Sequence, residues 1–80
     1  MNAAELNGRL VKSLLDKVEE TRFPSAEMQD RVEQYIQTRE EAADYAEALI
    51  AKIEDTRFPS RELVQRAEAA VNRLAAAERA

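Results

Sequence analysis

The chain has 80 residues, and its 12 basic and 16 acidic residues give a net charge of −4 at neutral pH. It contains no cysteine and no histidine. Disulfides, thiolate chemistry and histidine-based metal or acid–base sites are therefore excluded. Basic and acidic residues are interleaved along the whole chain, so we expect no nucleic-acid partner. No apolar run approaches the roughly 20 residues that cross a bilayer, and the N-terminus lacks a secretory signal, so we expect a cytoplasmic protein without membrane contact.

A hydrophobic content of 45% with two prolines and one glycine is typical of helical bundles and coiled coils. The first helix is predicted to begin after Asn2, a suitable N-cap with Glu5 three residues later. It should end near Thr21, because Pro24 forces Phe23 out of the helical region. Its apolar face is predicted to contain Ala4, Val11, Leu14 and Val18, flanked by Leu10 and Leu15.

One pentapeptide occurs twice, as Thr21–Ser25 and, 35 residues later, as Thr56–Ser60. Each of its residues has a structural role. Threonine ends a helix, arginine stabilises the negative end of that helix, phenylalanine folds over the end of the core, and proline and serine start the next helix. These roles account for all five residues. The alternative is that the pentapeptides form two recognition sites, since arginine and aromatic residues anchor many interfaces; the candidates are Arg22, Phe23, Arg57 and Phe58.

From Ser25 to Phe58 the chain has no glycine or proline. An unbroken heptad pattern runs through Met28, Val32, Tyr35, Arg39, Ala42, Ala46, Leu49 and Ile53. This pattern, and a repeat length of five heptads, predict one continuous helix from about Ala26 to Asp55. Against it, Thr38 and Glu41 fit a capping box, which would break the segment and produce a four-helix up-down bundle.

The last helix is predicted to begin at Ser60 and to run toward Ala77. Its inward face should comprise Leu63, Ala67, Ala70 and Leu74, with Val64 and Val71 beside them. In both repeats, serine is followed by a glutamate and arginine spaced four apart, which favours the ion pairs Glu27–Arg31 and Glu62–Arg66.

When the chain is aligned with itself at an offset of 35, Leu14–Ile36 matches Leu49–Val71 at 11 of 23 positions. The predicted fold is therefore all-α, a duplicated helical hairpin with three helices and a long central one. We expect a single domain over residues 1–80, built from repeats at about 4–38 and 39–73 and a C-terminal extension at 74–80.

Three further residues are candidates for an interaction site. Arg39 occupies a seam position, where it either specifies register or extends its charged end into solvent. Tyr35 and Tyr45 frame the same region, either in the core with hydroxyls at the rim or on a contact surface. The nearby acidic residues are expected to form a solvated face rather than a metal site, because no histidine accompanies them; they are Glu40, Glu41, Asp44 and Glu47.

These features predict a non-enzymatic helical protein-interaction module, an adaptor, assembly factor or regulator that self-associates through its seam as a homodimer. No cofactor or metal is expected. A protein partner is expected beside the homodimer. The alternatives are a nucleic-acid-associated regulator, which would require its basic residues to gather on one face, and a metal-binding helical bundle.

Overall fold

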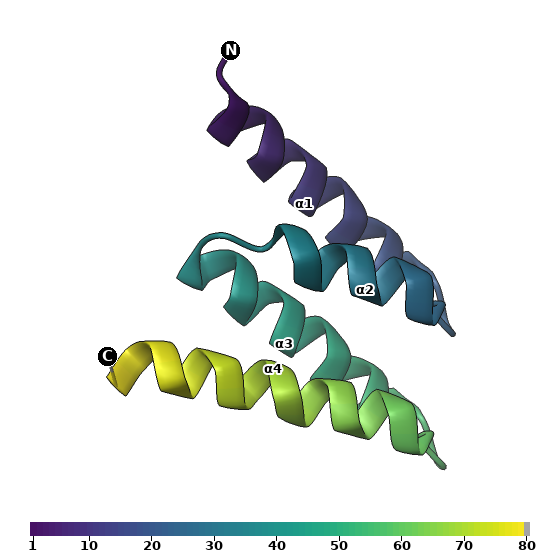
Figure 1. Cartoon of the computed structure of the whole chain (residues 1–80). Coiled ribbons are helices and arrows are strands. Elements are labelled where there is room, and N and C mark those ends of the chain that lie inside the picture. The colour runs from purple at the N-terminus through teal and green to yellow at the C-terminus, as the bar shows by residue number, and fades with distance from the viewer. Residues whose placement is uncertain (80) are drawn as a thin grey trace. The chain divides into compact units, whose positions relative to one another are not determined.

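The computed structural model describes residues 1–79 of the chain, and in them it contains four α-helices and no strand (Figure 1). The helices are α1 (Ala3–Glu20), α2 (Ala26–Tyr35), α3 (Arg39–Asp55) and α4 (Arg61–Arg79). The prediction of an all-α protein is therefore confirmed.

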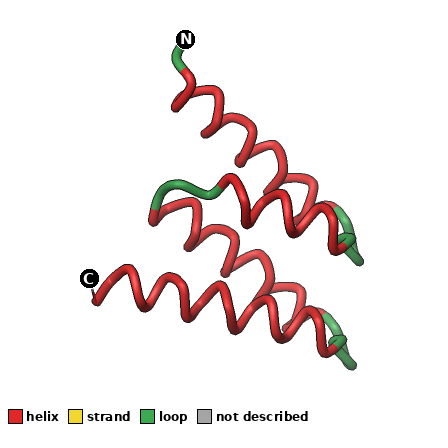
Figure 2. Tube along the Cα trace, viewed as in Figure 1, coloured by secondary structure: helices red, strands yellow, loops and turns green. Residues whose placement is uncertain are grey.

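The helices group into two compact units, and the division falls between Gln37 and Thr38. In the first unit α1 packs against α2, and in the second α3 packs against α4. Each unit is a helical hairpin whose two helices are joined by one copy of the pentapeptide, shown in green in the tube of Figure 2. The description of residues 1–80 as a single domain remains a prediction.

The predicted helix starts are confirmed by their hydrogen bonds. The Glu5 backbone N–H donates to Asn2 Oδ1 over 2.8 Å. The two serines cap α2 and α4 in the same way, since Met28 N–H and Leu63 N–H each donate to the serine Oγ over 3.1 Å. These bonds satisfy donors that a helix start would otherwise leave without partners. The predicted ion pairs at the starts of α2 and α4 are also confirmed, because Arg31 and Arg66 contact the glutamates four residues earlier.

The continuous helix predicted from about Ala26 to Asp55 is wrong in this structure. Helix α2 ends at Tyr35, and Ile36 adopts an extended conformation with φ −61° and ψ 126° while its N–H still donates to Val32 O. The next helix begins only at Arg39. The number of helices therefore agrees with the alternative that places a break near Thr38.

A capping box explains why the chain can break here without glycine or proline. The Glu41 backbone N–H donates to Thr38 Oγ1 over 3.0 Å, and the Thr38 N–H donates to Glu41 Oε1 over 3.1 Å. Two donors at the start of α3 are thus satisfied reciprocally. The heptad spacing of apolar residues continues unchanged across the interruption, so the pattern alone does not show where the helix breaks.

Replacing Thr38 by alanine should destabilise the protein by about 1 kcal/mol, because alanine cannot accept the Glu41 N–H. Thr38→Ser retains an accepting hydroxyl and should stay within about 0.5 kcal/mol of the wild type. Urea unfolding followed by circular dichroism measures both. If Thr38→Ala were as stable as Thr38→Ser, the capping box would not stabilise the start of α3.

The interior of the first hairpin is richer in branched side chains than that of the second. Val11, Val18 and Val32 are fully buried in the first, whereas Leu49 is the only large side chain buried to that degree among the described residues of the second. The remaining buried apolar positions of the second hairpin are Tyr45 and four alanines, which are Ala46, Ala48, Ala67 and Ala70. Two residues predicted beside inward faces, Leu10 and Val71, are instead exposed.

Candidate interaction surfaces

The two pentapeptide corners have similar local geometry, although the Thr21 N–H donates to Lys17 O and the Thr56 N–H to Ile53 O, one residue nearer. In each, the threonine closes the preceding helix in an extended conformation, with its N–H donating back to that helix. The following arginine lies over the ring of its neighbour: the guanidinium carbon of Arg22 is 5.5 Å from the Phe23 ring centroid, and that of Arg57 is 5.4 Å from the Phe58 centroid. Both distances fall within the range of a cation–π interaction. We call these two pairs the Arg–Phe tips.

The phenylalanines of the Arg–Phe tips do not cover the core, and this part of the structural interpretation is wrong. Phe23 is 75% exposed and Phe58 is 83% exposed. The corner instead contributes its threonine and proline to the partly buried surface, and the Pro24 carbonyl accepts a hydrogen bond from Gln29 Nε2 over 3.1 Å. In each corner the arginine and the phenylalanine form a bend between the partly buried threonine and proline, and both of their side chains are exposed.

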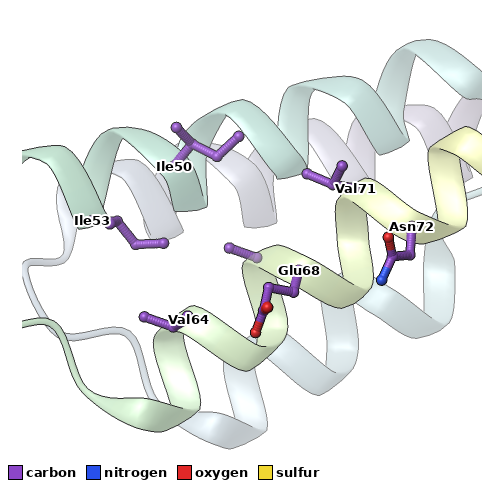
Figure 3. Close-up of a pocket in the computed structure, with 7 residues that line it drawn as sticks. Ile50, Ile53, Val64, Glu68, Val71 and Asn72 are labelled. Atoms are coloured by element: carbon purple, nitrogen blue, oxygen red, sulfur yellow. The ribbon is translucent and has the colours of Figure 1, made fainter.

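A second exposed apolar surface lies between the helices of the second hairpin. It is a shallow groove of about 310 Å³. Figure 3 shows its apolar lining, with Ile50 and Ile53 on α3 and Val64 and Val71 on α4. Ala67 completes the apolar lining, and the α4 residues Glu68 and Asn72 supply its polar side chains. We call this surface the α3/α4 groove.

The remaining candidate residues do not join either surface. Arg39 is the exposed first residue of α3, and its guanidinium donates to Glu78 Oε1 over 2.6 Å, so it closes the open end of the second hairpin. Tyr45 is buried in the second unit. Tyr35 is half-buried at the end of α2, where its carbonyl accepts a hydrogen bond from Asn7 Nδ2 over 2.8 Å.

The acidic residues at the start of α3 show no metal-binding arrangement. Within residues 1–79, no group of three or more carboxylates is placed to hold a metal ion. Glu41 is bonded to the Thr38 backbone in the capping box. None of the described helices combines the length and apolar character of a membrane span.

The sequence pattern does not reveal the α3/α4 groove, because the spacing of Val64 and Val71 predicts positions beside an inward face. A signal was present in the alanines of α4. Ala67 and Ala70 allow close approach of the helices but fill little volume, which leaves the larger neighbours at the edge of the contact.

The chain matches no protein-family model, no curated protein and no solved structure.

Proposed function

We propose that the chain is a non-enzymatic helical protein-interaction module, working as an adaptor, assembly factor or regulator, and that the Arg–Phe tips are its contact sites for a protein partner. Residues 1–80 act in this proposal as one domain of two hairpin repeats, rather than as a long central helix flanked by two others. The proposal assigns a binding role to the two tips and no catalytic reaction.

The observation that carries the proposal is the exposure of the same Arg–Phe pair in both repeats. A phenylalanine that is three-quarters or more exposed contributes little to the interior, yet the pentapeptide is unchanged between copies that differ elsewhere. A stacked arginine keeps the ring in one orientation and offers charge beside it. Arginine and aromatic side chains are the usual anchors of protein interfaces, and a partner with an apolar pocket bordered by carboxylates would suit this pair.

The ion pairs of the structure disfavour the nucleic-acid alternative. That alternative would use Arg9, Lys12, Arg31, Arg39, Arg66 and Arg73. Four of these already contact carboxylates: Lys12 with Asp16, Arg31 with Glu27, Arg39 with Glu78, and Arg66 with Glu62. Binding to a nucleic acid gains affinity because basic side chains displace the counterions condensed on its phosphates, and a cation that already lies beside a carboxylate contributes less to that release. The net charge of −4 adds a repulsive field.

Self-association also remains part of the proposal, but not through the heptad seam. The break between α2 and α3 interrupts that seam, and Arg39 lies at the surface. We therefore do not propose a dimer built on antiparallel long helices, because α2 and α3 are separate helices in each chain.

The proposal is tested by capturing protein partners with the wild type and with the double variant Phe23→Ser, Phe58→Ser. We expect specific partners to be lost from the variant, while its free energy of unfolding stays within about 0.5 kcal/mol per site of the wild type. A matched variant, Gln34→Ser with Gln65→Ser, changes two exposed helix residues and should retain the partners. Capture of the same proteins by all three forms would refute the role of the tips.

A further inference from the structure

The two Arg–Phe tips are equivalent sites that belong to separate units of the chain. Phe23 lies in the first unit and Phe58 in the second, and each ring has its arginine at nearly the same distance, 5.5 Å and 5.4 Å. The rings are 75% and 83% exposed with both units present. Because taking away one unit cannot lower the exposure of a ring on the other, each hairpin presents its tip by itself.

Local hydrogen bonds hold each tip in place. On one side the threonine N–H donates to the preceding helix, from Thr21 to Lys17 O and from Thr56 to Ile53 O. On the other side the serine of the pentapeptide caps the next helix, over 3.1 Å in both corners. Each tip is therefore held between two helix ends of its own hairpin. This reduces the ordering cost that a flexible loop would incur on binding.

One tip is too small to hold a protein partner alone. A phenylalanine buries about 150–250 Å², and even with its arginine this falls well short of the roughly 800 Å² that each partner buries in a stable interface. Two tips on one molecule act differently, because after the first has bound, the second binds at an effective concentration in the millimolar range. The combined affinity then exceeds that of a single tip by about 10²–10⁴-fold.

We propose that one chain engages two identical pockets of its partner at the same time, one with each tip; this rests on the proposed function of the tips. Identical pockets occur on the subunits of a symmetric homo-oligomer. The partner is therefore a homo-oligomer, and each of its subunits offers an apolar pocket bordered by carboxylates. The phenylalanine ring needs the apolar cover, and the guanidinium beside it needs the carboxylates.

The covalent chain limits how far apart the two pockets lie. Between the tips are α2, with 10 residues, and α3, with 17, and a helix rises by about 1.5 Å per residue. Each remaining residue adds at most about 3.6 Å, so the tips cannot separate by more than about 75 Å. This limit holds for every orientation of the two units. A subunit of 100 residues has a radius of gyration of about 13 Å, so equivalent pockets on neighbouring subunits fall within the limit.

The test compares single tip variants with the wild type on a surface. The chain is attached so sparsely that neighbouring copies cannot share a partner, and the probe is the set of proteins that the wild type captures from a lysate of its own cells. We expect Phe23→Ser and Phe58→Ser each to release these proteins about 10²–10⁴ times faster than the wild type. The control Gln34→Ser, an exposed change on α2, should release them at the wild-type rate.

A densely coated surface supplies a second readout that a merely destabilised variant would not give. There, neighbouring copies of one single variant provide the second tip, so slow release should return for both single variants. It should not return for the double variant Phe23→Ser, Phe58→Ser, which has no tip ring left. Light scattering of the released partner should give the native mass of a homo-oligomer.

Independent binding by the two tips has a different signature. A single variant that keeps half of the captured protein with an unchanged release rate would overturn the proposal, as would a monomeric partner. If the double variant still lost its partners, the proposed function of the tips would stand. Undiminished capture by the double variant, or a wild type that retains no protein, would refute that function as well.

Discussion

Replacing Leu49 by alanine is expected to destabilise the protein by about 2–5 kcal/mol, the usual cost of truncating a fully buried leucine. Leu49 is the largest fully buried side chain in residues 1–79. Its neighbours on the inward face of the second hairpin are mainly alanines, which cannot extend into the vacated space. At about 0.05–0.15 kcal/mol per residue, a folded chain of 80 residues has a total stability of about 4–12 kcal/mol, so this single change should remove a large share of it.

The matched control is the next residue on the same helix. Ile50→Ala removes a similar volume from the edge of the groove, where the side chain already contacts water. We expect it to lose about 1 kcal/mol or less. Both variants are compared with the wild type by urea unfolding at a low micromolar concentration, where self-association does not contribute. Equal losses for the two variants would contradict the assignment of Leu49 to the interior.

Replacing Gln29 by glutamate is expected to cost about 3 kcal/mol at pH 7. Gln29 is the buried polar residue of the described chain, and its Nε2 donates to Pro24 O over 3.1 Å and to Ser25 O over 3.4 Å. Its Oε1 is buried and has no hydrogen-bond partner among residues 1–79. A carboxylate at this position would face two carbonyl oxygens without a donor, and burial disfavours its charged form.

The loss should depend on pH in a defined direction. Burial raises the pKa of the introduced carboxyl above its unfolded value of about 4.3. Below that pH the carboxyl is protonated in both states, so the penalty is absent. It grows as the pH rises toward the folded-state pKa and is constant above it, and about 3 kcal/mol corresponds to a rise of about two pKa units.

Gln29→Met serves as the control for this prediction. It removes the two hydrogen bonds and also the oxygen without a partner, and it keeps a similar side-chain length. We expect a change of about 1 kcal/mol or less and no dependence on pH. Urea unfolding at pH 4 and pH 7 measures both variants. A Gln29→Glu protein with the same stability difference from the wild type at both pH values would show that the side chain reaches solvent.

The local parts of the fold were predictable because they depend on residues three or four positions apart. Asn2, Ser25 and Ser60 cap helices through hydrogen bonds to the third residue after them. The pentapeptide ends one helix and begins the next in both copies. Thr38 and Glu41 also form a local signal, but the heptad pattern runs through them without interruption and favours a continuous helix. That pattern depends only on the spacing of apolar residues, so it does not detect a short non-helical connection.

The candidate surfaces were less predictable, because solvent exposure is decided by packing between helices. Val64 and Ile53 have the spacing of interior residues, yet they line an open groove. Leu15 and Ile50 occupy equivalent repeat positions with nearly the same side chain, and only the former is buried. No property of either residue type distinguishes them.

Taken by itself, the sequence determined the helical class, the duplication, the caps and the positions of the two corners, since each arises from short-range hydrogen bonds and backbone preferences. The tertiary structure decided that Phe23 and Phe58 face solvent and that α2 and α3 are separate helices. It also decided which apolar side chains line the α3/α4 groove. The break between α2 and α3 uses a local capping box whose signal competes with the heptad pattern. The exposure of the side chains depends instead on how much of each surface the neighbouring helices cover, and the hydrophobic effect that drives this burial is not directional.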